Sequence, residues 1–215
     1  IKFIGPKTRL SACSTRKLEE FLEYLQHGRK VPCSPKSFDR RVTTLKVFFG
    51  WLARDQILAS DPAAALIHQQ ARAPLPRVLS DQEVEKLLEV TRKMRDAPQS
   101  PDARPHLLVT LLLGTTIKKS ECMNIRLEHI DLSDISRPTV YIHYDKPRQL
   151  FKARRLALPP DWSETLQLYL RRYQPKERLF ECTPRNLEYL LHTISTVAGL
   201  SEMLTFDTLR WTSAT

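Results

Sequence analysis

The sequence has little glycine and no long hydrophobic run. Its five glycines are scattered through 215 residues, which argues against a P-loop or a dinucleotide-binding fold, because both need clustered glycines beside phosphate. The longest apolar run, Leu107–Leu113, is far shorter than the roughly 18 residues of a membrane span. The first residues, Ile1–Pro6, lack the apolar core of a signal peptide. These absences predict a protein that neither crosses nor enters a membrane.

Cysteine is also sparse, and its spacing is not that of a metal site. The four cysteines form no Cys-x-x-Cys pair, and the six histidines follow no ligand spacing. We therefore expect reduced thiols in a cytoplasmic protein, with no metal and no cofactor. The cysteines are Cys13, Cys33, Cys122 and Cys182.

Positive charge is abundant and unevenly distributed. The formal net charge is +10, and residues 1–79 hold 14 Lys and Arg against 6 Asp and Glu, whereas residues 80–215 hold 20 against 18. An excess of cations in one part of a chain attracts the phosphate backbone of nucleic acid without regard to base sequence. The alternative is a basic protein with no polyanionic partner.

Two helices are predicted in the first 60 residues. Ser14 or Thr15 caps a helix that runs to Gly28, which stands where a C′ glycine belongs. Ser34-Pro35 starts a longer helix by the pairing of an N-cap with an N1 proline. The second helix buries Phe38, Val42, Leu45, Phe49 and Leu52. A short third helix is expected over residues 63–69.

The second of these helices also carries cations and hydroxyl groups that suit phosphate contacts. A face that is merely solvated is the alternative. These candidate DNA-binding residues are Lys36, Arg40, Arg41, Thr43, Thr44 and Lys46.

A domain boundary is predicted near residue 75. Residues 71–77 contain prolines that favour an extended linker, and Ser80 with Glu83 forms a capping box that starts a new helix. We expect a helical domain over residues 1–72, a linker over 73–79 and a second domain over 80–215.

The second domain should be mainly α with a small antiparallel sheet, an α+β fold. His106–Leu113 predicts a buried helix, and further helices are expected from Pro160 and from Thr183, the latter closed by Gly199. Thr139–Tyr144 and Leu150–Leu158 predict a hairpin with its turn at residues 145–147. The hairpin is basic through Lys146, Arg148, Lys152, Arg154 and Arg155, and its three arginines are candidate DNA-binding residues.

The last residues predict a helix capped by Thr205, with Arg210 in its first or second turn. A guanidinium near free N–H groups at a helix start suits a phosphate oxygen. The alternative is a surface arginine on an ordinary amphipathic helix.

Two segments resemble the arginine boxes of the tyrosine recombinases, or phage integrases. Leu209-Arg210, followed by Thr212 and Ala214-Thr215, resembles the second box, with Asp207 at the position of a family histidine and Trp211 replacing another. Residues 114–122 resemble the first box, with Lys118 at the position of the catalytic arginine and Ser120-Glu121 retained.

The resemblance extends over nearly the whole chain. Residues 48–63 and 76–83 are similar to the end of the family's helical, SAM-like core-binding domain and the start of its catalytic domain. The family's usual first core-binding helix has no counterpart in residues 1–14.

This resemblance implies cleavage and rejoining of duplex DNA without metal or ATP. Two arginines hold the phosphate, a hairpin lysine protonates the leaving oxygen and a tyrosine attacks. The implied site residues are Arg210, Lys118, Glu121, Asp207 and either Lys146 or Lys152. Family members act as tetramers on DNA.

All six tyrosines precede the second box, so the nucleophile is expected in a segment beyond Thr215. The second hypothesis is a relative that binds DNA without cutting it. A helical protein–protein adaptor is the third, and the basic hairpin speaks against it.

Overall fold

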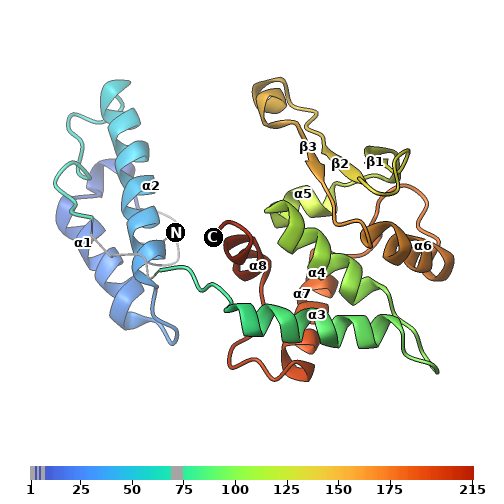
Figure 1. Ribbon diagram of the computed structural model, residues 1–215. Coiled ribbons are helices and arrows are strands. Elements are labelled where there is room, and N and C mark those ends of the chain that lie inside the picture. Colours follow the sequence, from blue (N-terminus) through green and yellow to red (C-terminus); the bar gives the residue numbers. More distant parts are fainter. Residues whose placement is uncertain (1–2, 4, 6–7, 69–74) are drawn as a thin grey trace. The chain divides into compact units, whose positions relative to one another are not determined.

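The computed structural model describes Phe3, Gly5 and residues 8–68 and 75–215 (Figure 1). The chain forms two compact units, Ile1–Leu75 and Pro76–Thr215. Residues 73 and 74 of the predicted linker lie outside the described residues. No helix among the described residues is long and apolar enough to cross a membrane.

The first unit consists of η1 (Leu10–Ala12), α1 (Thr15–Glu23), the π-helix η2 (Tyr24–Gly28) and α2 (Pro35–Arg54). Ser14 and Ser34 accept hydrogen bonds from the N–H groups of Lys17 and Ser37, so both predicted N-caps are confirmed. The core joins the apolar faces of both helices. It contains Leu18, Leu22, Leu25, Phe38, Val42, Phe49, Leu52, Ala63 and Leu66.

Two predictions for this unit need correction. Residues 62–65 form a turn and residues 66–68 are not helical, so the predicted helix from Ala63 is wrong over its described part, and Gln69 lies outside the described residues. Gly28 does end the first helical segment, but not as a left-handed C-cap. A Cβ at Gly28 would lie 2.3 Å from Cδ2 of Tyr24, so glycine is needed there for close packing.

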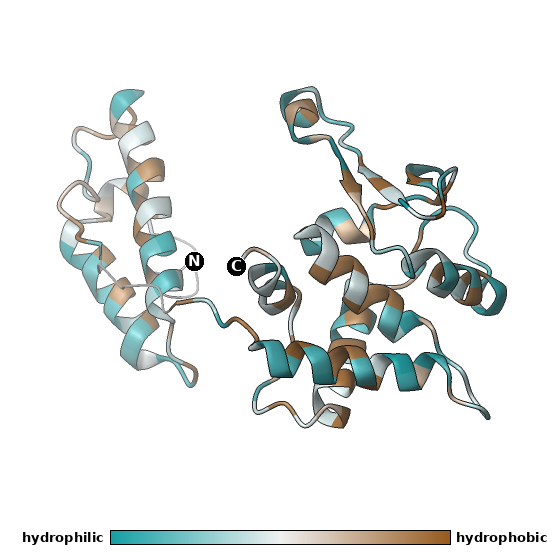
Figure 2. Cartoon of the chain, in the orientation of Figure 1, coloured by the Kyte–Doolittle hydropathy of each residue, from teal (hydrophilic) through white to brown (hydrophobic). Residues whose placement is uncertain are grey.

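The second unit is built around α4, and its fold class is the predicted one, mainly α with a small antiparallel sheet. Helix α4 is buried nearly all round and packs against α3, α6, α7 and α8, and Figure 2 shows it brown over much of its length. The helices are α3 (Asp81–Arg95), α4 (Arg104–Thr115), α5 (Lys119–Met123), η3 (Leu127–His129), η4 (Pro147–Lys152), α6 (Trp162–Tyr173), α7 (Pro184–Val197) and α8 (Phe206–Thr212).

The sheet has three antiparallel strands in the order β1 (Ile130–Asp131), β2 (Thr139–Ile142) and β3 (Arg154–Ala157). Strands β2 and β3 pair from Thr139 with Ala157 to Ile142 with Arg154. The predicted hairpin is therefore present, but the predicted strand over 150–158 is too long. Residues 147–152 form the 3-10 helix η4, because Pro147 lacks the N–H that a ladder position would use.

Most predicted helix ends are confirmed. Ser80 and Glu83 form the capping box, Thr183 caps α7, and Gly199 has a φ of 63° just after that helix. The apolar residues of the helix predicted from Thr183 continue to Val197, but Val197 is the last residue of α7 and is 57% exposed.

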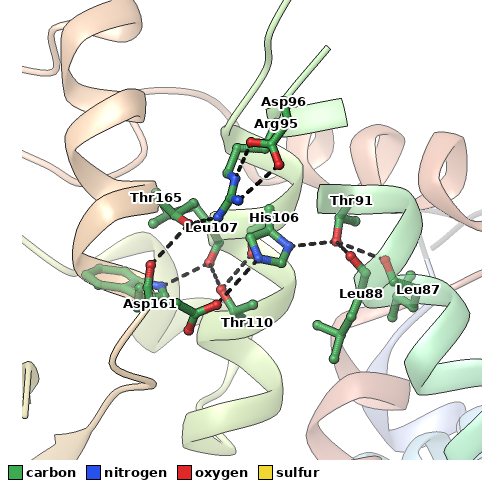
Figure 3. A network of polar contacts seen from close by, with 11 residues as sticks. Leu87, Leu88, Thr91, Arg95, Asp96, His106, Leu107, Thr110, Asp161 and Thr165 are labelled. Atoms are coloured by element: carbon green, nitrogen blue, oxygen red, sulfur yellow. Dashed lines mark hydrogen bonds and ion pairs between the residues drawn. The ribbon is translucent and has the colours of Figure 1, made fainter. Parts of the chain in front are cut away.

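A polar network joins α3, α4 and the start of α6 (Figure 3). His106 is almost fully buried, and its Nδ1 lies 2.9 Å from Oγ1 of Thr91. Its Nε2 has no hydrogen-bond partner among the described residues, and Oδ2 of Asp161 lies 4.0 Å away. Arg95 donates to Oγ1 of Thr165 across 3.1 Å. Thr91 thus supplies the one hydrogen bond that satisfies the buried imidazole.

Substitution of Thr91 by valine should therefore destabilise the second unit. The change keeps the shape of the side chain but leaves Nδ1 of His106 buried without a partner, which costs about 1–3 kcal/mol in free energy of unfolding. Urea denaturation followed by circular dichroism measures the effect. Thr193→Val is the control, because exposed Thr193 on α7 bonds only the Tyr189 carbonyl. Equal stability of the two variants would contradict the prediction.

Candidate functional site

Lys118 lies in the turn that connects α4 with α5. Helix α4 ends at Thr115, and Thr116 adopts a left-handed conformation with a φ of 54° that stops the helix. Ile117 is fully buried and anchors the turn, whereas Lys118 is exposed and stands at the N-cap position of α5. The turn thus presents the ammonium group of Lys118 to solvent.

Glu121 is the central residue of the site, and its side chain is only 5% exposed. Its carboxylate accepts hydrogen bonds from the backbone N–H of Lys118 (2.8 Å), from both terminal nitrogens of Arg154 (2.9 and 3.2 Å) and from the hydroxyl of Tyr144. One carboxylate therefore ties the Lys118 turn to both ends of the hairpin connection.

The environment of Glu121 keeps it ionised. Burial by itself would raise the pKa of this carboxyl, but the hydrogen bonds from Arg154, Lys118 and Tyr144 outweigh burial and lower the pKa to about 2. A carboxylate with this bidentate guanidinium partner is held in one orientation. Glu121 acts on its neighbours by position, since a group with so low a pKa carries no proton near neutral pH.

Two of the three hairpin arginines predicted to contact DNA are engaged within the protein. Arg154 is bound by Glu121, and Arg155 donates to Oδ2 of Asp131 across 2.8 Å. Arg155 remains 61% exposed, so it can reach a ligand more easily than Arg154 can. Arg148 is exposed on η4, and no ion pair engages it within the described parts of the chain.

The two candidate hairpin lysines differ in their surroundings. Lys146 precedes η4 and lines a cavity of about 320 Å³ together with Ser120, Glu121 and Tyr144. Lys152 is the last residue of η4 and does not line this cavity. Its Nζ lies 5.4 Å from the ring centroid of Phe151. The structure thus brings Lys146, rather than Lys152, together with Glu121.

Arg210 lies in the last turn of the short helix α8, so the dipole at the start of that helix does not assist it. Its side chain is 24% exposed, pairs with Oδ1 of Asp207 at 3.2 Å and lies 5.2 Å from the Trp211 ring centroid. Asp207 is 77% exposed. Helix α8 packs against α4, and the C-terminal end of α4 leads to the Lys118 turn. The structure therefore holds Arg210 through Asp207 and Trp211, not through Glu121.

The sequence did not indicate Tyr144 as a site residue. It was predicted as part of a strand, but it lies two residues beyond β2 and donates to Glu121. The hydrogen bond to Glu121, helped by burial, raises the pKa of this phenol, which makes it a poor nucleophile. The cavity also contains His129, His143 and Arg178. Of these three residues, His143 alone had a sequence signal. It stands two positions after Tyr141, so both were expected on the same face of the predicted strand.

The predicted phosphate ligands of the first unit lie along α2. Lys36, Arg40 and Arg41 are exposed, and no ion pair engages them in the described residues. The hydroxyls of Thr43 and Thr44 donate to carbonyls four residues earlier, which is usual for a helical threonine. Lys46 donates to the Ala64 carbonyl at 3.2 Å, so it holds the turn after α2.

No metal-binding group of three or more His, Cys, Asp or Glu occurs among the described residues. The four cysteines are free thiols.

Comparison with known proteins gives a consistent result. The tyrosine recombinase XerC of Anoxybacillus flavithermus is 30% identical over 204 residues, which cover 88% of this chain and 64% of that protein. The chain thus spans less than two thirds of the length of this relative. A scan of family models finds no match.

Two solved structures share the fold. XerH recombinase in a post-cleavage complex with a palindromic difH substrate has a TM-score of 0.73 at 20% identity, and the match covers 99% of this chain and 64% of that one. A lambda integrase dimer bound to a core site has a TM-score of 0.68 at 17% identity, covering 98% and 75%.

Replacement of Glu121 by glutamine should destabilise the second unit at neutral pH. The variant loses the charge that binds Arg154, a loss of about 1–3 kcal/mol in free energy of unfolding. Because the folded-state pKa of Glu121 lies below its ordinary value of 4.5, the stabilisation is complete above pH 4.5 and is lost as pH falls towards 2. Denaturation at pH 7 and pH 3 should show the difference between wild type and E121Q shrinking in acid.

The control for this experiment is Glu85→Gln, because Glu85 is exposed on α3. Its effect should stay within about 0.5 kcal/mol at both pH values. An E121Q deficit that is the same at pH 3 as at pH 7 would show that the charge of Glu121 is not what stabilises the hairpin.

Proposed function

Because this chain belongs to the tyrosine recombinase (integrase) family, we propose that it binds duplex DNA and holds one phosphodiester of the backbone in a cationic site. Lys118 and Arg210 bind the non-bridging oxygens. Lys146 faces the leaving oxygen as the proton donor. Glu121 positions the Lys118 turn and the hairpin relative to each other. The observation that supports this assignment most is the carboxylate of Glu121, which joins these two segments from distant parts of the chain.

The clamp is weaker than one made of two arginines. An ammonium group supplies the charge of a guanidinium but not its planar pair of donors, so Lys118 stabilises the transition state less well than arginine. Asp207 also places a carboxylate on Arg210. A phosphate that binds Arg210 competes with this carboxylate.

The nucleophile of the proposed reaction is a tyrosine beyond Thr215 in a longer polypeptide. It attacks the phosphorus atom, the bond to the 5′ oxygen breaks and Lys146 supplies the proton to that oxygen. The product is a 3′-phosphotyrosine bond, whose energy allows the strands to be rejoined without ATP. We place this protein on the bacterial nucleoid, as a tetramer on its DNA.

A second function, DNA binding without cleavage, is favoured by the Asp207–Arg210 pair. This pair lies 3.2 Å apart at the position where the family's chemistry needs a free arginine. In this alternative the cationic surfaces attach the protein to DNA as an architectural or regulatory factor.

Both functions require electrostatic contact between α2 and the phosphate backbone. The double variant Lys36→Ala/Arg40→Ala should make the slope of log K against log salt less negative by roughly 2, because each lost phosphate contact changes it by about 0.9. Fluorescence anisotropy of a labelled duplex, at salt concentrations from about 50 to about 200 mM, measures this slope.

The matched control is Arg16→Ala/Lys93→Ala, which removes two exposed cations that are already paired with Glu20 and Glu89. Its slope should equal that of the wild type. If both double variants have the same slope, α2 does not contact phosphate.

The variant Lys118→Arg, made in the longest natural polypeptide that contains this chain, tests whether the protein cleaves DNA or only binds it. The planar guanidinium restores two donors to the phosphate, and we expect at least about tenfold faster formation of a covalent adduct with nicked duplex DNA. Denaturing gels measure the adduct. The control is Lys119→Arg, because the neighbouring Lys119 is paired with Glu188 at 2.7 Å. If the wild type and both variants bind the duplex but form no covalent adduct, the cleavage proposal is wrong and the protein binds DNA without cutting it.

A further inference from the structure

The outer end of the basic hairpin exposes two adjacent apolar side chains. Phe151 is 79% exposed and Leu150 is 53% exposed. Both lie in η4, which forms the end of the hairpin farthest from α4 (Figure 1). In Figure 2 the ribbon at this end is brown over a short stretch, between teal segments. Apolar side chains this exposed contribute nothing to the core, so packing within the unit does not account for them.

The charge around these side chains indicates the kind of surface that covers them. Arg148 and Lys152 lie in the same short helix as the apolar pair, and no ion pair engages them in the described residues. The acidic residue just before this helix, Asp145, lies 3.1 Å from His143. An apolar tip that also carries free cations fits a ligand with an apolar interior and anionic edges. Stacked base pairs between phosphates have this character.

The geometry of η4 places cation and ring together. In a 3-10 helix, side chains three residues apart lie above one another, so Arg148 and Phe151 share one edge. Nζ of Lys152 lies 5.4 Å from the centroid of the Phe151 ring. A ring inserted between two bases would therefore carry a cation towards the phosphate beside it.

The base of the hairpin is held firmly. Tyr144 on one side and Arg154 on the other both bind Glu121, and Ile142 pairs with Arg154 in the ladder. A tip fixed in this way loses little conformational freedom when it binds, which favours insertion over a glancing contact.

We propose that Phe151, supported by Leu150, inserts as a wedge between two adjacent base pairs of duplex DNA, while Arg148 and Lys152 contact the flanking phosphates. The insertion partly unstacks one base step and bends the duplex, and it favours pyrimidine–purine steps, which unstack most easily. This inference rests on the proposed DNA binding and adds a contact that shapes the DNA.

The test uses the whole chain and a short duplex that carries 2-aminopurine at TA steps, whose fluorescence rises when stacking is lost. Wild type should raise the fluorescence on binding. Phe151→Ala should abolish the rise and weaken binding by about 5- to 100-fold, the range for loss of one base–aromatic contact. The salt slope should not change, since no charge is removed. Phe151→Trp should restore the rise.

The matched control is Ile135→Ala, which removes another exposed apolar side chain (64%) from the loop before β2. This variant should behave as the wild type. Duplex binding by the wild type with no fluorescence rise, or with Phe151→Ala equal to Ile135→Ala, would overturn the wedge and leave the proposed function intact. Failure of the wild type to bind duplex would instead overturn the proposed function. A change of oligomeric state in Phe151→Ala with unchanged fluorescence, measured by sedimentation, would assign the tip to a second copy of the chain.

Discussion

The arrangement of the candidate site depends on one buried carboxylate. Glu121 accepts hydrogen bonds from the turn that carries Lys118, from Arg154 at the start of β3 and from Tyr144 beyond the end of β2. Removal of a charged partner from such a cluster leaves polar groups unsatisfied. Because the pKa of Glu121 is lowered to about 2, this carboxylate is ionised at neutral pH. The orientation of the hairpin is therefore set by electrostatics as well as by its short ladder.

Helix α4 provides the frame on which this carboxylate acts. It is buried on nearly all sides, and α3, α6, α7 and α8 pack around it. The left-handed Thr116 ends the helix and directs the chain into the exposed Lys118. A cation on a mobile loop would lose more entropy on binding phosphate than one held at the end of a core helix. The core thus contributes to the site by fixing the end of α4, from which the chain continues to Lys118.

The basic residues of this chain divide into engaged and free groups. Arg154, Arg155 and Arg210 each have a carboxylate partner, whereas Lys36, Arg40 and the cations at the tip of the hairpin face solvent without one in the described residues. Free cations attract phosphate directly, whereas an engaged cation such as Arg210 has to exchange its carboxylate partner for phosphate. Basic residues of one segment, such as Arg148 and Arg154 of the hairpin, therefore differ in role although the sequence alone does not distinguish them.

The sequence by itself determined the elements that depend on local chemistry. Side-chain caps and apolar periodicity act within a few residues, so the helices that start at Ser14, Ser34, Ser80 and Thr183 could be predicted, as could the hairpin and the α+β class. The arginine-box resemblance also pointed to Glu121, Lys118 and Arg210. It could not show that residues 147–152 form a 3-10 helix or that residues 63–68 are not helical.

Only the tertiary structure decided which side chains meet. The place of Lys146 in one cavity with Glu121, the binding of Arg154 by Glu121 and the hydrogen bond from Tyr144 to Glu121 depend on contacts between residues more than 20 positions apart. Such contacts are set by how the hairpin packs beside α5, and no local pattern encodes that packing. The exposure of Phe151 was equally hidden, because an apolar residue in a predicted strand is expected to face the core unless the fold turns it towards solvent.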